Sequence, residues 1–318
     1  MVSLKSKLLI RMSSHTDTFF SGESLAQDFA VSRAAVWKAI HALQNEGHAI
    51  ESSSRGYRYL PDNDLLNPDI IRSCCPEISF PLYVFDSIDS TNNYAKSIAS
   101  AADAHGTLVI ANHQTAGRGR RGHTFFSPEN CGLYLSLIIK PHSRVQEMLK
   151  ITVAAAVAAV EAIQQTSHAR PKIKWVNDLF IGKRKIAGIL TEAISDFESG
   201  DLDAIIIGIG INVRKTKLPE DIENIAGAIN DPSLSRSRLA AALWQRLLYW
   251  TDHLEDPQLM EAYRRYSLLI GHVIVYEING EKRSGTVESI NDQGNLVVLD
   301  EANEKSILAS GEVSVKDW

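Results

Sequence analysis

Six runs of apolar, β-forming residues between Pro81 and Val213 constrain the fold of this 318-residue chain more than any other feature. They are LYVFDSI, TLVIAN, GLYLSLII, KIKWV, KIAGILTEAI and DAIIIGIGINV. Some alternate apolar and polar residues while others are continuously apolar, which is typical of one sheet with a covered face. Helices are expected near 89–101 and, where Ala and Val run almost all round, at 146–165. The pattern predicts an α+β domain built on a mixed sheet.

The first sixty residues show a different pattern, three short helices and a hairpin. Helices are expected at 3–13, 22–29 and 33–45, with Ser21 and Ser32 as N-caps of the second and third. Two strands around SSSRG follow at 48–60. This predicts a winged helix-turn-helix, although any three-helix bundle has the same periodicity. The residues expected to face DNA are Ser21, Gly22, Ser32, Arg33, Ala34, Ala35, Trp37, Lys38 and His41, with Arg55 and Arg58 from the hairpin.

Charge supports that interpretation weakly. Residues 1–60 carry seven Lys and Arg against five Asp and Glu, a net of +2, whereas the whole chain has a formal charge of -5.

No run approaches the ~18 apolar residues of a membrane span, and the polar N-terminus lacks a secretory pattern, so we expect a cytoplasmic protein with no membrane partner. Cys74, Cys75 and Cys131 have neither a disulfide pattern nor a metal-ligand spacing, which favours idle thiols.

The rest of the chain divides by composition. The stretch 61–81 is rich in Pro, Asn and Asp and predicts a linker with a short helix at 68–73. A helical region at 236–269, broken around Asp256 and Pro257, is expected to be core and spacer. Short strands separated by NGE, NDQG and SG turns then predict a small SH3-like β-barrel. The predicted domains are 1–62 (winged helix-turn-helix), 63–80 (linker), 81–270 (catalytic) and 271–318 (barrel).

The segment QTAGRGRRG, Gln114 to Gly122, carries the most chemical information. Its three arginines among three glycines place permanently charged, bidentate donors on a flexible backbone, which suits a polyphosphate. Neither this segment nor GIGIN at 208–212 has P-loop or Rossmann spacing. A solvated basic loop or a second nucleic-acid contact remains an alternative.

Polar residues are unusually dense in the segments KWVNDL and RKIAGILTE. Lys174, Asn177, Asp178 and Lys185 are expected near the ends or on the faces of neighbouring strands. Lys185, flanked by apolar residues, would lose solvent on folding and would then need a carboxylate or phosphate partner. The alternatives are a turn at 177–178 and a surface lysine at a strand end.

Five motifs in order, DSTN at 89–92, QTAGRGRRG, KWxND, KxAGILxE and GIGIN, resemble the biotin protein ligases. The winged helix resembles the bifunctional bacterial branch, the biotin operon repressors. The resemblance covers essentially the whole chain and implies a class II synthetase-like catalytic domain. It also implies a reaction in two halves: biotin attacks the α-phosphate of ATP to give biotinoyl-5′-AMP and pyrophosphate, and a lysine of an acceptor protein then takes the biotinoyl group.

The resemblance also implies roles for particular residues. Arg118, Arg120, Lys185 and Asp178 would be catalytic, with Asp178 binding Mg²⁺ or orienting the incoming lysine; no dedicated metal site is expected beyond the Mg²⁺ of ATP. The biotin and adenylate pocket would be formed by Ser90, Thr91, Asn92, Gln114, Gly117, Arg118, Gly119, Arg120, Arg121, Phe125, Lys185, Gly188, Leu190 and Asn212. The glycine-hinged arginine loop would close over the adenylate and shield it from water.

Three departures from the family pattern are visible. Val176 stands where proline is usual, and Phe125 stands where tryptophan is common. The segment VRKTKLPEDIENIAGA after Asn212 looks shorter than the family's adenylate-covering loop and has no aromatic residue. This last change puts in doubt how strongly the ligand orders that loop and couples to repression.

The partners implied are the biotin carboxyl carrier protein of acetyl-CoA carboxylase, operator DNA of biotin synthesis genes, and a second copy of the chain when the adenylate, as corepressor, is bound. Two other classes of protein remain open. A related acyl ligase such as a lipoate ligase shares the catalytic fold, but GRGRRG and KxAGILxE speak against it. A regulator whose enzyme-like domain only senses a metabolite is disfavoured by the intact Arg118, Arg120 and Lys185.

Overall fold

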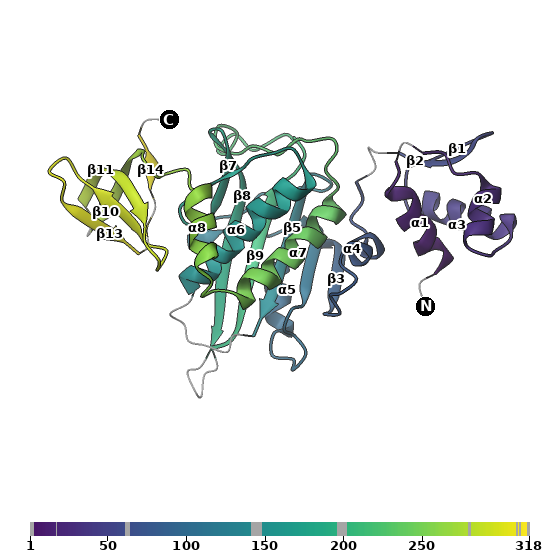
Figure 1. Cartoon of the computed structure of the whole chain (residues 1–318), viewed down its shortest axis with the longest axis horizontal. Helices are drawn as coiled ribbons and strands as arrows, with labels where there is room; N and C mark the ends of the chain where they lie inside the picture. The colour runs from purple at the N-terminus through teal and green to yellow at the C-terminus, as the bar shows by residue number, and fades with distance from the viewer. Residues whose placement is uncertain are drawn as a thin grey trace. The chain divides into compact units, whose positions relative to one another are not determined.

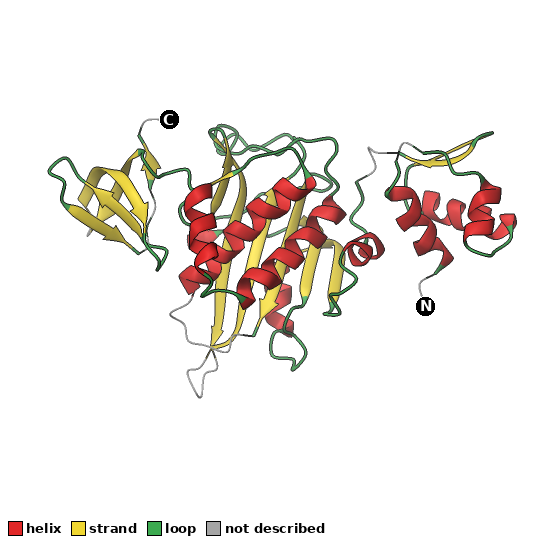
Figure 2. Cartoon of the chain, viewed as in Figure 1, coloured by secondary structure: helices red, strands yellow, loops and turns green. Residues whose placement is uncertain are grey.

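The computed structural model describes residues 3–16, 18–60, 64–140, 148–195, 202–278, 281–309, 311 and 313–316. The chain forms two compact units, which are described separately. One unit consists of residues 1–79 and 232–241, and the other of residues 80–231 and 242–318. Helices and strands are labelled in Figure 1 and coloured by type in Figure 2. The fourfold division expected from the sequence stays a prediction.

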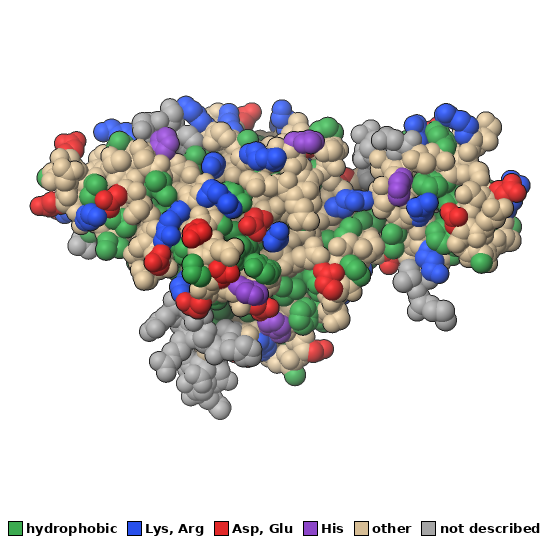
Figure 3. All heavy atoms as spheres, in the orientation of Figure 1, with side chains coloured by type: hydrophobic (Ala, Val, Ile, Leu, Met, Phe, Trp, Pro, Cys, Tyr) green, Lys and Arg blue, Asp and Glu red, His purple; other side chains and the backbone are tan. Residues whose placement is uncertain are grey.

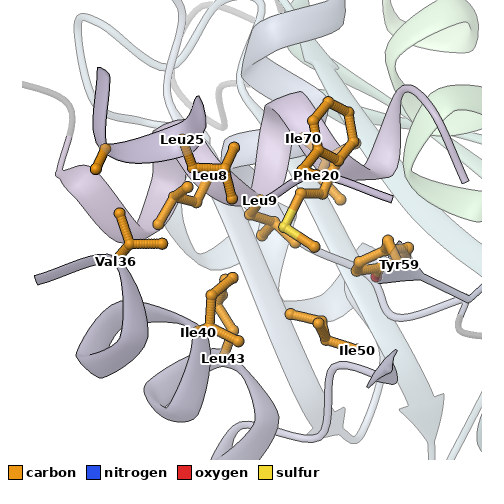
Figure 4. Close-up of a cluster of buried hydrophobic side chains, with 12 residues drawn as sticks. Leu8, Leu9, Phe20, Leu25, Val36, Ile40, Leu43, Ile50, Tyr59 and Ile70 are labelled. Atoms are coloured by element: carbon orange, nitrogen blue, oxygen red, sulfur yellow. The ribbon is translucent and has the colours of Figure 1, made fainter. Parts of the chain in front are cut away.

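The first unit contains the helix-turn-helix domain. Its elements are α1 (Leu4–Ser13), α2 (Gly22–Asp28), α3 (Arg33–Asn45) and the hairpin strands β1 (Ile50–Ser53) and β2 (Gly56–Tyr59). Serine caps fix where the helices begin, since the hydroxyl groups of Ser21 and Ser32 accept hydrogen bonds from the amides of Ser24 (3.0 Å) and Ala35 (3.2 Å). One apolar side of each helix meets in a core formed by Leu8, Leu9, Leu25, Val36, Ile40 and Leu43, shown in Figure 4. The expected helices and hairpin are confirmed.

A buried arginine fastens the segment that follows the hairpin. Arg236 is the first residue of α7 (Arg236–Asp252) and is 1% exposed. Its amide donates to the Asp64 carboxylate at 2.6 Å, its Nε donates to the Asp64 carbonyl at 3.1 Å, and the Ser237 hydroxyl donates to the carbonyl of Leu65 at 3.0 Å. Helix α4 (Pro68–Cys74) follows, close to the predicted short helix. The polar linker is thereby tied to the start of α7 inside the first unit.

The second unit is built on a mixed sheet of seven strands. The strands are β3 (Leu82–Ile88), β4 (Leu108–Gln114), β5 (Gly132–Ile139), β6 (Lys172–Lys174), β7 (Asp178–Ile181), β8 (Arg184–Ser195) and β9 (Leu202–Asn212), in the order β3-β4-β5-β9-β8-β7-β6. The β3–β4 pair is parallel and the other pairs are antiparallel. Strand β7 was not among the six expected runs; it forms because residues 178–181 pair with strands on both sides.

Helices cover the sheet unequally on its two faces. In Figure 1, α6 (Met148–Thr166), α7 and α8 (Pro257–Tyr266) lie over one face and α5 (Thr91–Ile98) lies on the other. Around α5, Ala95 and Ala99 pack against Val109, Ile138 and Ile206. Helix α6 is long and apolar enough to cross a membrane by composition, but 61% of its apolar window is buried inside the fold, as in a core helix. Helix α5 covers only part of its face of the sheet, and the remainder of that face is available for a binding site.

The C-terminal strands belong to the same unit as the central sheet. They are β10 (Val273–Ile278), β11 (Glu281–Ile290), β12 (Leu296–Leu299), β13 (Lys305–Leu308) and β14 (Ser314–Val315), in an antiparallel sheet ordered β13-β12-β11-β10-β14. The indole N–H of Trp175 donates to the carbonyl of Gly294 at 2.9 Å, which fastens the turn before β12 to the central domain. The expected strands are confirmed, while closure into an SH3-like barrel stays a prediction.

The buried Arg236 generates a first prediction. Arg236→Met leaves the Asp64 carboxylate without its guanidinium, and we expect a loss of about 3 kcal/mol in the free energy of unfolding. Urea unfolding followed by circular dichroism measures the loss. The control is Arg238→Met two residues along α7, which removes hydrogen bonds to neutral oxygen atoms of Ser13 and Ser14 and should cost about 1 kcal/mol. Equal losses in the two variants would contradict the prediction.

Candidate active site and nucleic-acid interface

A pocket of about 440 Å³ lies over the sheet face that α5 leaves uncovered. Thirteen of the residues expected from the sequence line it: Ser90, Thr91, Asn92, Gln114, Arg118, Gly119, Arg120, Arg121, Phe125, Asp178, Lys185, Gly188 and Leu190. They come from the N-terminal end of α5, the end of β4, the loop between β4 and β5, and the strands β7 and β8. The sequence motifs, separated by up to a hundred residues, therefore meet in one cavity.

Glycine residues on neighbouring strands form the floor of this pocket. Gly188 of β8 pairs with Gly210 of β9. Gly208 lies two residues before Gly210 on β9 and therefore on the same face of the sheet. A Cβ atom at Gly210 would lie 2.5 Å from the Phe125 ring, and one at Gly208 would collide with the side chain of Asn92. The floor is bare backbone because other side chains of the pocket already occupy the space above these glycines.

The arginine loop is a closed turn held by backbone hydrogen bonds. The amide of Phe125 donates to the carbonyl of Gly117 at 2.9 Å, and the amide of Gly119 donates to the carbonyl of His123 at 2.7 Å. Arg121 has a positive φ of 52° and Gly122 one of 79° at the tip. The sequence suggested a flexible backbone, but the described conformation is fixed at its base and turns sharply at its tip.

Arg120 and Lys185 of the pocket each have a described polar partner. Arg120 donates to the amide oxygen of Asn177 at 2.8 Å, while Lys185 Nζ lies 2.8 Å from Asp178 Oδ1. The carboxylate partner expected for Lys185 is thus present. The described lining contains five Lys and Arg side chains (Arg118, Arg120, Arg121, Lys174 and Lys185) and one carboxylate, Asp178. This excess of positive charge over bare backbone suits a ligand that carries several negative charges.

The polar wall at the start of α5 is rigidly oriented. Gln114 Oε1 accepts from the amide of Thr91 at 2.9 Å, and Gln114 Nε2 donates to the Ser127 hydroxyl at 2.9 Å. The fully buried Ser136 lies 2.8 Å from Thr91 Oγ1 and 2.5 Å from Asn92 Oδ1. These contacts fix which amide and hydroxyl atoms face the cavity, and such placed polar groups give a mostly apolar ligand its orientation.

Two expected pocket residues lie elsewhere. Gly117 is buried beneath the loop, where a Cβ atom would lie 2.6 Å from the Ser127 hydroxyl. Asn212 donates to the carbonyl of Gly227 at 2.9 Å and lines a second hollow of about 490 Å³ together with the exposed Phe126. Residues that are neighbours along the chain line the two hollows: Phe125 and Ile225 line the first, and Phe126 and Ala226 line the second.

Most of the residues expected to face DNA are exposed in the first unit. Ser32, Arg33, Ala34, Trp37, Lys38 and His41 are exposed along α3, Ala35 is half-buried, and Ser21 and Gly22 begin α2. Trp37 is 55% exposed and contacts the His41 ring edge-on at 4.3 Å between centroids. Arg55 lies over the Phe19 ring. Arg58 pairs with Glu51 at 2.6 Å, a contact that the sequence did not predict, and its expected contact with DNA stays a prediction.

Several lining residues were not identified from the sequence. Gly208 and Gly210 had a readable signal, because glycines two positions apart on one strand share a face. Trp175, Phe180 and Ile225 also line the pocket, together with Gly311, Val313 and Ser314 from the C-terminal segment. Their segments are brought there by pairing between distant strands, for which a single sequence offers no local signal.

No group of three or more His, Cys, Asp and Glu side chains able to hold a metal ion occurs among the described residues. Asp178 is the carboxylate available in the described pocket lining. One carboxylate together with phosphate oxygens is a usual environment for Mg²⁺. The residues therefore fit a Mg²⁺ ion that is carried by a nucleotide.

Comparison with known proteins agrees with these features. Residues 84–212 match the biotin/lipoate A/B protein ligase family, and residues 5–58 match a helix-turn-helix domain. The bifunctional ligase/repressor BirA of Bacillus spizizenii is 31% identical over 97% of this chain and 98% of its own, and that of Escherichia coli is 30% identical over 94% and 93%. The biotin protein ligase of Aquifex aeolicus, solved with biotin and ATP, is 24% identical, covers 74% of this chain and 98% of its own, and has a TM-score of 0.62.

A helix-turn-helix domain joined to a ligase domain defines a class of protein that combines DNA binding with an enzyme. The chain is more than 30% identical to two bifunctional ligase/repressors along nearly the full length of each, which identifies the family within this class. The chain belongs to the bifunctional ligase/repressor family. The resemblance inferred from the five motifs and the winged helix is confirmed.

The glycine floor generates a second prediction. Gly210→Ala forces the Phe125 ring aside and should destabilise the protein by about 2 kcal/mol, as overpacking commonly does. Gly188→Ala, directly opposite on β8, meets its nearest neighbours at 3.4 Å and should cost less than about 1 kcal/mol. Thermal unfolding of both variants checks this; equal melting temperatures would refute the account of the floor.

Proposed function

We propose that this protein is an ATP-dependent biotin protein ligase, which activates biotin as biotinoyl-5′-AMP and transfers it to a lysine of a biotin carboxyl carrier protein, and that it represses biotin synthesis genes. One observation carries the enzymatic part: five cationic side chains surround a glycine-floored pocket in a chain of this family. Joining a carboxylate to a polyphosphate brings anions together, so fixed cations at that point lower the barrier.

In the first half-reaction the glycine floor supports the bicyclic ring of biotin. Ser90, Thr91, Asn92 and Gln114 offer hydroxyl and amide groups for its ureido atoms, and Phe125 forms an apolar wall. The biotin carboxylate then reaches the α-phosphate beside Arg118, Arg120 and Lys185. A bond forms between the carboxylate oxygen and phosphorus, the bond to the pyrophosphate oxygen breaks, and no protein nucleophile takes part.

The second hollow is the place we propose for the nucleotide base. Phe126 offers an exposed ring for stacking, and Asn212 offers an amide for hydrogen bonds. This assignment gives Asn212 a role in adenylate binding although it does not line the first pocket. Mg²⁺ bound to the phosphates and Asp178 would neutralise charge on the leaving pyrophosphate.

In the second half-reaction the amine of the acceptor lysine attacks the mixed anhydride, and AMP leaves. The lysine must lose a proton to react, and Asp178, the carboxylate in the described pocket lining, is our candidate to orient the lysine or accept the proton. The arginine loop covers the anhydride, so that water and other amines are excluded. Arg121 lies at the tip of this loop, where its positive φ turns the chain back.

Mass spectrometry of the purified protein with biotin, ATP and Mg²⁺ tests the enzymatic proposal. We expect bound biotinoyl-AMP without acceptor, and a mass gain on one lysine when a biotin carboxyl carrier domain is added. Biotin binding without either product would instead support a metabolite sensor. Activity with lipoate in place of biotin would favour the lipoate ligase alternative.

The DNA-binding part of the proposal rests on the first unit. Arg33, Trp37, Lys38 and His41 project from α3 as a recognition helix requires, and Arg55 projects from the hairpin. We propose that the adenylate-bound protein forms a homodimer on a palindromic operator, with biotinoyl-5′-AMP as corepressor, in the cytoplasm. Consumption of the adenylate by the acceptor protein would then relieve repression. Figure 3 shows acidic and basic side chains interspersed on the visible face of the second unit, without a continuous basic area.

A third prediction concerns the arginine loop. Arg120→Gly removes a cation beside the adenylate and loosens the loop, so we expect the adenylate to escape and to label lysines of bystander proteins at least tenfold more than the wild type does. Blotting with labelled streptavidin in the presence of serum albumin measures this. Arg170→Gly, which removes an exposed arginine outside the pocket, is the control. Unchanged selectivity in Arg120→Gly would contradict the role of the loop.

A fourth prediction concerns DNA. Lys38→Ala should weaken operator binding about tenfold and lower the salt dependence by about one counterion, since it removes a phosphate or base contact. Lys7→Ala, an equal loss of charge on an exposed position of α1, should change neither. Gel retardation over a salt series, with and without biotin and ATP, measures both. No retardation in either state would exclude repression.

A further inference from the structure

A carboxylate with no assigned role lies behind the pocket wall. Glu192 of β8 is 18% exposed at its side chain and is not among the lining residues. Its Oε1 lies 2.6 Å from Lys96 Nζ and 3.4 Å from Arg118 Nη2, and its Oε2 accepts from Asn92 Nδ2 at 2.8 Å. One carboxylate thus contacts the arginine loop and the polar wall at once.

The contact with Asn92 sets the orientation of the polar wall. Because Asn92 Nδ2 donates to Glu192, its Oδ1 faces Ser136, which lies beside the Thr91 hydroxyl. Thr91 in turn contacts Gln114. A chain of polar contacts therefore runs from Glu192 to two side chains that we assign to biotin. Within it, each amide has one arrangement that satisfies its donors and acceptors.

The contact with Arg118 holds one cation among several. Arg118 is about half exposed and donates to Asn93 Oδ1 at 3.0 Å. Neighbouring cations repel it, and Glu192 supplies the opposing charge from behind. Partial burial alone would raise the pKa of Glu192, but hydrogen bonds from Lys96 and Asn92 and the charges of Lys96 and Arg118 hold this pKa below its usual value. Glu192 therefore stays ionised at neutral pH, and its contribution is lost as the pH falls through that lowered pKa.

We propose that Glu192 is a positioning residue of the active site, which aligns Arg118 and Asn92 for the ligand from behind the pocket wall. The inference rests on the proposed function for the identity of the ligand. Glutamine cannot replace Glu192: if its oxygen accepts from Asn92, its NH₂ group faces the two cations, and if it is turned round, two NH₂ groups face each other. Either arrangement releases Arg118 or Asn92.

A double-mutant cycle tests this proposal. The proteins are wild type, Glu192→Gln, Arg118→Ala and the double variant, and the measurement is the single-turnover rate of pyrophosphate release with biotin and ATP. We expect Glu192→Gln to lose ten- to fiftyfold and the double variant to fall no further than about twofold below Arg118→Ala, because the two residues act as one unit. Lys96→Met removes the other cation at Glu192 but keeps the contact between Glu192 and Arg118, so the rate should fall less than threefold.

The outcomes separate this inference from the proposed function. An unchanged rate in Glu192→Gln would overturn the positioning role even in an active ligase, and losses that multiply in the double variant would overturn positioning through Arg118. If the wild type releases no pyrophosphate, the ligase proposal fails. Calorimetry then measures the affinity of the same four proteins for inorganic pyrophosphate. Non-additive losses of affinity there would still support positioning of Arg118, and additive losses would refute it.

Discussion

Gly188, Gly208 and Gly210 leave one face of the central sheet without side chains, which makes room there for the Phe125 ring and the Asn92 side chain that line the pocket. Glycine within a strand weakens it by roughly 0.5–1 kcal/mol relative to alanine. The sheet carries this cost on two adjacent central strands, β8 and β9, whose other face packs beneath apolar helices. The cavity is therefore placed where the scaffold is stable enough to hold its walls in one position.

That same rigidity lets the pocket hold like charges together. Five cationic side chains line a cavity with one carboxylate, and three of them have described polar partners. Asp178 contacts Lys185, Asn177 contacts Arg120, and Glu192 contacts Arg118 from behind the pocket wall. These partners hold the cations in defined positions without neutralising the site. An anionic ligand then gains from charges that do not have to reorganise when it arrives.

The parts of this structure that were predictable are those with local causes. Ser21 and Ser32 cap the helices that follow them, and 3.6-residue periodicity placed the core of the first unit. The pocket residues within motifs were recognisable because the motifs occur together and in order. Strand β7 and the Arg58–Glu51 pair depend on the exact register between strands that are neighbours along the chain, and a single sequence does not fix that register. The contacts of Glu192 join segments that are about a hundred residues apart, and no local pattern encodes them.

Arg118 and Arg120 of the arginine loop are not equivalent, because their partners differ in charge. Arg118 already interacts with a carboxylate, so exchanging that partner for a phosphate gains little. The partner described for Arg120 is the neutral amide oxygen of Asn177. Exchanging a neutral acceptor for a charged one raises the net contribution of a hydrogen bond from about 1 to about 2 kcal/mol. We therefore expect an anionic ligand to attract Arg120 more strongly than Arg118, which a β-bridge to Thr124 holds at the base of the loop.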